Sequence, residues 1–215
     1  MSFTGPAISV MNKFYKKLSL FGLGASLSES FCRNNNIPVP EYRLQRLDST
    51  GLYLPQTRTR KAQVLVDLEK TANPVENPGH MRWSHPGWKT DRTAFGVVLH
   101  ETGHHVDRVI MEHVTKTKPI RQDVHGAYAS DRDEWFEAHS GKRVSGYEPN
   151  ASEAFAETMR LFIGNPDLLR RAIPSRYNYL CQVLRLQAVV PLDYKTAIGN
   201  SKYYPAAEKW IGVNK

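Results

Sequence analysis

The spacing of hydrophobic and polar positions predicts a helix near the start of the chain, then short strands, then further helices. The first helix is amphipathic, with an apolar face formed by Met11, Phe14, Tyr15, Leu18 and Phe21. We expect it to dock on the domain or on a partner. Glycines interrupt its apolar run, so we expect no cleavable signal peptide. Residues 1–40 are assigned to this helix and its connector.

Two strands are predicted in residues 51–57 and 61–70, after an extended, proline-containing piece. In the second strand Val64, Val66 and Leu68 alternate with other residues and so lie on one side. Strands that are followed by helices, and do not alternate with them, indicate an α+β fold with a small sheet.

The longest predicted helix spans about residues 92–115, with Asp91 as its N-cap. Residues 116–149 are rich in charged residues and glycine, and we expect them to be irregular. Another helix begins after Asn150 or Ser152, either of which is a good capping residue, and ends at a Gly-Asn-Pro sequence.

Two further helical pieces, 166–173 and 175–187, are separated by Pro174. We assign residues 41–190 to one domain. Residues 191–215 contain several Tyr and Trp but little core periodicity, which is typical of an arm that lies on another surface.

Composition and charge narrow the function classes. The 215 residues are 40% hydrophobic and 23% charged, as in soluble globular domains, and no apolar run is long enough to span a bilayer. The net charge of +8 favours anionic partners, but the basic residues are scattered and no nucleic-acid-binding motif is present. Cys32 and Cys181 lack CxxC spacing; free buried thiols are favoured over a disulfide.

The sequence VVLHETGHHVD, residues 97–107, contains the candidate chemistry. His100 and His104 are one helical turn apart and project side by side, at the separation that one metal ion needs. Glu101 is rotated by about 100° from His100, so it borders the metal and can take the proton of an attacking water. This HExxH pattern predicts a hydrolytic zinc site. Two ordinary core or surface histidines are the alternative.

The residues around the motif add two constraints. Gly103 costs the helix roughly 1 kcal/mol relative to Ala, which indicates that something approaches closely there. Asp107 and Ile110 exclude the longer HExxHxxGxxH pattern, so the third ligand must come from elsewhere. Asp107 lies on the same face as His104 and suits a hydrogen bond that supports a ligand or the helix packing.

The second motif helix supplies the best third ligand. Glu153 and Glu157 lie on one face of a largely apolar helix, where unpaired carboxylates are costly. Glu153 can bind the metal while Glu157 accepts a hydrogen bond from a ligand histidine and so fixes its tautomer. A surface ion pair between Glu157 and Arg160, or another basic residue, is the alternative. Tyr147, just before this helix, can donate to an oxyanion that develops on an attacked carbonyl.

These two segments, HETGHHVD and SGYEPNASEAFAETMRLF, resemble the metallopeptidase domain of anthrax lethal factor and the related Pro-Pro endopeptidases, over residues 92–165. The resemblance implies a zincin-like α+β domain in which His100, His104 and Glu153 bind zinc. It also implies that Glu101 is the general base and that Tyr147 stabilises the oxyanion. Glu157 and Asp107 would be supporting residues. The spacing between Tyr147 and Glu153 is one residue shorter than in that family.

The leading hypothesis is a zinc-dependent endopeptidase that binds one Zn²⁺ per chain and acts on peptide or protein substrates. The alternative is a structural or interaction subunit of a larger assembly, such as a virion, that keeps a zincin scaffold with little activity; the aromatic-rich 191–215 segment motivates it. A metal-dependent nuclease fits the charge but matches the HExxH pattern poorly. We expect the protein in the cytoplasm or inside such an assembly.

Overall fold

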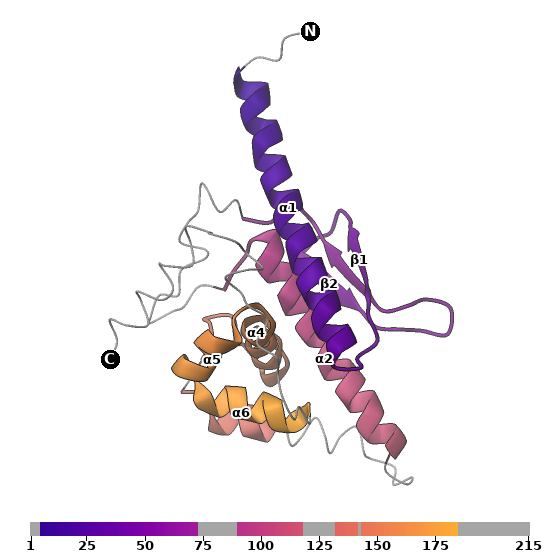
Figure 1. Ribbon diagram of the computed structural model, residues 1–215, viewed down its shortest axis with the longest axis vertical. Coiled ribbons are helices and arrows are strands. Elements are labelled where there is room, and N and C mark those ends of the chain that lie inside the picture. Colours follow the sequence, from indigo (N-terminus) through magenta and orange to yellow (C-terminus); the bar gives the residue numbers. More distant parts are fainter. Residues whose placement is uncertain (1–4, 73–89, 118–131, 142, 185–215) are drawn as a thin grey trace.

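The computed structural model describes residues 5–72, 90–117, 132–141 and 143–184 (Figure 1). Within these residues the protein is a mixed α+β structure with a small three-stranded sheet, as the sequence predicted. The expected arm at 191–215 lies outside the described residues.

Eight elements of this part have defined bounds. They are α1 (Gly5–Asn34), β1 (Glu41–Leu44), β2 (Gly51–Leu54), β3 (Gln63–Val66), α2 (Ala94–Thr117), α4 (Ala151–Gly164), α5 (Pro166–Ala172) and α6 (Pro174–Val183). Ile173 separates the last two helices, and Pro174, the predicted separator, is the first residue of α6.

Residues 132–138 are also helical, which corrects the expectation that 116–149 would be irregular throughout. The reason is tertiary packing, which overrides a weak local pattern. Trp135 stacks on Tyr179 of α6 with ring centroids 4.1 Å apart, and Phe136 is buried against Phe155 of α4.

The sheet has the strand order β1-β3-β2, in which β3 pairs with β1 in parallel and with β2 antiparallel. All four residues of β3 are buried. The predicted apolar side of this segment is confirmed, because Val64, Val66 and Leu68 share one core cluster with Ala94 and Val98 of α2. Strand β2 lies at an edge of the sheet, and this edge borders the candidate site.

Helix α2 lies between two layers. Figure 1 shows α1 running beside it, the sheet on one side, and α4, α5 and α6 on the other. The larger core cluster fills the helical side and includes Leu99 of α2, Phe155 and Met159 of α4, and Leu180 of α6. Packing on both sides therefore holds α2 in place.

The predicted apolar face of α1 divides into two parts. Leu18 and Phe21 pack against the sheet-side cluster, as docking on the domain requires. Met11, Phe14 and Tyr15 are 41%, 50% and 56% exposed, in the part of α1 that projects beyond the other elements in Figure 1. Docking on the domain is therefore confirmed only for the later turns. None of the described helices has the length and apolar character that a membrane crossing demands.

Two helix starts were predicted with different success. Asn150 caps α4, since its side chain accepts a hydrogen bond from Glu153 N at 3.0 Å. Asp91 is not the N-cap of α2: its carboxylate accepts from Thr93 N at 2.9 Å, and Thr93 Oγ1 accepts from Gly96 N at 3.4 Å. Asp91 therefore closes a short turn ahead of the helix, and Thr93 is the capping residue.

Both cysteines are free thiols. Cys32 is fully buried, and burial raises its pKa to about 12, whereas Cys181 is half-buried. A thiol with so high a pKa carries almost no thiolate at neutral pH, so Cys32 serves as a core residue.

Candidate metal centre

The site depends on a close approach of α2 and α4. A Cβ added at Gly103 of α2 would lie 2.7 Å from Ala156 Cα and 2.9 Å from Ala156 O. Only a glycine permits this contact, which confirms the expectation that something approaches the helix there. The contact places the first turn of α4 directly over the two histidines of α2.

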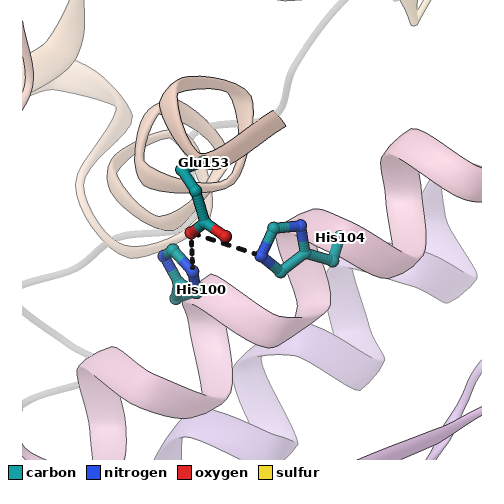
Figure 2. Close-up of side chains that lie close together, drawn as sticks. All are labelled: His100, His104 and Glu153. Carbon is teal, nitrogen blue, oxygen red and sulfur yellow. Dashed lines mark ion pairs between the residues drawn. The ribbon is translucent and has the colours of Figure 1, made fainter. Parts of the chain in front are cut away.

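Figure 2 shows Glu153 of α4 pointing between His100 and His104 of α2. Glu153 Oε2 lies 3.1 Å from His100 Nε2 and 3.6 Å from His104 Nε2. The centroids of the two imidazole rings are 4.9 Å apart. The three residues each offer one ligand atom, and these atoms lie within 4.8 Å of one another. The structure therefore brings together the three predicted ligands.

The residues present fit a metal ion. Glu153 Oε2 is buried and forms no hydrogen bond, although both imidazoles face it. A buried carboxylate oxygen without a hydrogen bond is costly unless a cation meets it. Two imidazole nitrogens with one carboxylate oxygen form the donor set of known catalytic zinc sites.

The proximity of these side chains shifts their pKa values. Contacts from His100 and then His104 hold the pKa of Glu153 near 2, below its usual value. Burial opposes the charged form of His100, but the nearby carboxylates of Glu153 and Glu157 raise its pKa to about 9. The site thus favours a positive charge between these carboxylates, and a bound metal would replace the proton as that charge.

Glu157 supports His100 from behind. Its Oε1 atom accepts from His100 Nδ1 at 2.8 Å and from Thr90 Oγ1 at 3.0 Å, and Arg160 donates to both oxygens at 3.0 Å. Burial disfavours its charge, yet Arg160 and His100 hold its pKa well below the usual range. The contact with Arg160 also forms, but it is buried and not on the surface as the alternative supposed.

Glu101 lies at the wall between α2 and the sheet edge. It is largely buried, and burial raises its pKa above the ordinary value. A Cβ added at Gly51 of β2 would lie 2.7 Å from Glu101 Oε1, so a larger residue there would displace the carboxylate. A carboxylate with a raised pKa at the border of the site is suited to accept and return a proton.

Asp107 does not contact the ligands through any hydrogen bond that the structure defines. Its carboxylate forms a buried ion pair with Arg132, from the helical segment 132–138. It therefore anchors that segment against α2, which is the packing option of the two that the sequence left open.

Tyr147 lies beside the ligands in the loop that precedes α4. Its ring centroid is 5.8 Å from that of His100, and the residue is 50% exposed. Partial burial raises its pKa above the usual value, so the phenol keeps its proton at neutral pH. It is placed as a hydrogen-bond donor at the mouth of the site.

A cleft runs across the ligands. Two adjoining hollows of 660 and 500 Å³ both include Gly51, His100, Glu101 and Tyr147 in their walls. The first hollow extends toward Lys70 and Arg92, and the second toward Leu52, Arg108 and Met111. An extended chain segment therefore has room to cross the site.

Several residues around the site were not predicted from the sequence. Thr90 and Arg132 lie outside the two motif helices, and no local pattern marked them. Gly51 carried a signal, since a glycine at the start of a predicted strand often permits a close approach.

Comparisons of the chain with protein-family models, with curated proteins and with solved structures found no match. Function is therefore inferred from the residues of the site and from the local sequence resemblance described above. Three features of the site support this inference: the three possible ligand residues, the buried Glu153 Oε2 without a hydrogen bond, and the adjoining carboxylate of Glu101.

Proposed function

We propose that the protein is a zinc-dependent endopeptidase with a zincin-like domain. The observation that carries the proposal is Glu153 Oε2, a buried oxygen without a hydrogen bond that faces the Nε2 atoms of His100 and His104. The resemblance to the lethal factor and Pro-Pro endopeptidase domains supports the same ligand set.

Zinc bound by these three residues would polarise a substrate carbonyl and lower the pKa of water. Glu101 takes the proton of the attacking water, because it borders the ligands without belonging to them. Its raised pKa then lets it hand this proton to the leaving amine. Both transfers use one carboxylate that lies at the wall of the cleft.

Tyr147 acts on the attacked carbonyl. Its protonated phenol lies at the mouth of the site, beside His100, and donates a hydrogen bond to the oxyanion that develops on the attacked carbonyl. This contact forms only as charge develops, so it lowers the barrier more than it strengthens substrate binding.

Glu157 and Arg160 hold His100 in its working orientation. The Nδ1–H of His100 donates to Glu157, which leaves Nε2 free to bind the metal. Arg160 keeps Glu157 ionised in a fully buried position. Glu157 thereby fixes the tautomer and the ring plane of His100 independently of metal binding.

The substrate is an extended peptide. Strand β2 forms an edge of the sheet, and Gly51, Leu52 and Tyr53 line the cleft beside the ligands. An extended segment can add to such an edge through main-chain hydrogen bonds. The main chain then supplies affinity, while the two ends of the cleft select side chains.

The test compares the wild type with Glu101→Gln, using metal content by mass spectrometry and a peptide-library cleavage assay. We expect about one zinc per chain in both proteins, and a fall in kcat of about 10²–10⁴-fold in the variant. Glu112→Gln, on the same helix but in an exposed pair with Arg108, is the matched control and should keep full activity. Loss of zinc in Glu101→Gln would contradict its assignment as a base.

An interaction subunit of a larger assembly is the second candidate. It is favoured by the exposed apolar residues Met11, Phe14 and Tyr15 on the projecting part of α1. A wild-type protein that binds zinc but cleaves no peptide in the library would support this candidate over the peptidase.

A further inference from the structure

A buried carboxylate holds the loop that carries Tyr147. Glu148 Oε1 accepts hydrogen bonds from Val144 N at 2.7 Å and from Ser145 N at 3.1 Å. Ser145 Oγ in turn accepts from Tyr147 N at 3.0 Å. The turn before α4 is therefore closed around one carboxylate, adjacent in sequence to Tyr147.

An arginine from α6 completes this arrangement. Arg176 Nη2 donates to Glu148 Oε2 at 2.8 Å, and Arg176 Nη1 donates to Thr158 Oγ1 of α4 at 3.0 Å. The Arg176 guanidinium also lies over the ring of Phe136, 5.0 Å from its centroid. One side chain thus ties the Tyr147 loop to the helix that supplies Glu153.

The same pair is a poor device for stability alone. The side chains of Arg176 and Glu148 are 1% and 2% exposed, so both charges have lost their hydration. Arg176 Nε is buried and, within the described part of the chain, has no hydrogen-bond partner. Well-packed neutral residues often stabilise a core as well as a buried ion pair does, so the pair calls for another explanation.

We propose that Glu148 and Arg176 are positioning residues, which hold Tyr147 over the metal site at the point where the substrate oxyanion develops. The inference rests on the proposed function. Tyr147 is half-exposed and has solvent on one side, so its loop fixes its place relative to His100. A hydrogen-bond donor must be in place before the charge forms if it is to stabilise the transition state.

This role makes a kinetic prediction. A misplaced donor weakens an interaction made in the transition state, so kcat falls while KM changes little. Zinc binding should persist, because the ligands come from α2 and α4 and not from the loop. Tyr147→Phe sets the upper limit, since it removes the hydrogen-bond donor itself.

The test uses the double variant Arg176→Met/Glu148→Gln, which leaves no unpaired charge in the core. We expect kcat to fall by about 10-fold to 100-fold, within the loss caused by Tyr147→Phe, with KM and zinc content unchanged. In a Tyr147→Phe background the double variant should cause no further loss, because residues that act through one group are not additive. A further loss of the same size in that background would overturn the proposal.

Two controls separate positioning from general damage. Leu27→Ala removes a core side chain on α1, remote from the Tyr147 loop, and should lower stability without lowering kcat per folded molecule. Arg176→Lys keeps the charge and should recover part of the kcat. An equal loss of kcat in Leu27→Ala would reduce the pair to a structural role.

Amide hydrogen exchange gives a readout that needs no activity. The Val144 and Ser145 amides, which donate to Glu148, should exchange faster in the double variant with zinc still bound. Unchanged exchange would overturn the proposal even in an active enzyme. Faster exchange in a zinc-bound protein that cleaves no peptide would support the restraint on the loop while rejecting the proposed peptidase.

Discussion

The first and second turns of α4 each present a glutamate to the same histidine, yet the two carboxylates differ in burial and in hydrogen bonding. Glu157, in the second turn, is 0% exposed and accepts hydrogen bonds from His100, Thr90 and Arg160. Glu153, in the first turn, has a side chain 22% exposed and a buried oxygen with no hydrogen bond. The partners of each carboxylate, and not its residue type, distinguish the proposed metal ligand from the residue that supports it.

The position of each residue along the helix explains the contrast. Glu153 lies in the first turn, where Asn150 caps the backbone and the helix dipole favours a negative charge. The cleft opens at this end. Glu157 lies one turn deeper, where no water reaches it, so only a buried cation such as Arg160 can keep it charged.

Replacing Glu153 should have the largest effect on zinc binding. We expect Glu153→Ala to lower zinc affinity by more than the roughly 100-fold that loss of a supporting residue causes, because a ligand atom itself disappears. Competition against a chromophoric chelator measures the affinity. The fold should persist, since Glu153 is not part of a saturated network. Wild-type zinc affinity in Glu153→Ala would disprove its role as a ligand.

Replacing the saturated carboxylate should have a smaller effect on the metal. Glu157→Gln keeps the shape but weakens the contacts to His100 and Arg160, and we expect zinc affinity to fall about 10-fold to 100-fold. The same chelator competition applies.

Stability separates the two glutamates further. Glu157→Gln removes a buried carboxylate that pairs with Arg160 and should destabilise the fold, whereas Glu153→Ala should not. Denaturant unfolding of both metal-free variants measures this difference. Equal losses of stability in the two variants would contradict the distinction between ligand and support.

Sequence alone predicted those parts of the site that a local pattern encodes. The one-turn spacing of His100 and His104, the cap at Asn150 and the glycine at 103 each express a rule of helix geometry. The contact of Glu153 with the two histidines could also be expected, because polar side chains on two largely apolar helices need partners and have few available.

The rest could not be predicted, because it depends on which distant segments meet. Asp107 gave no indication that Arg132 would be its partner, nor did Glu148 indicate Arg176. The same applies to the helical segment 132–138, which forms around the packing of its aromatic residues on α6. Capping at Thr93 in place of Asp91 shows the usual uncertainty at a helix boundary.

The smallest expected effect on the metal comes from the contact that brings both turns of α4 onto α2. A methyl group at Gly103 would meet Ala156, which lies between Glu153 and Glu157, so both glutamates should shift together. We expect Gly103→Ala to destabilise the fold by about 1–3 kcal/mol, although alanine is the better helix former, and to weaken zinc binding only a few-fold. Gly22→Ala is the matched control: it is also a helical glycine, but nothing lies within 4 Å of the added Cβ, so it should stabilise the protein by up to about 1 kcal/mol. Denaturant unfolding compares the two, and a stabilising effect at both positions would show that α2 and α4 are not held together by this contact.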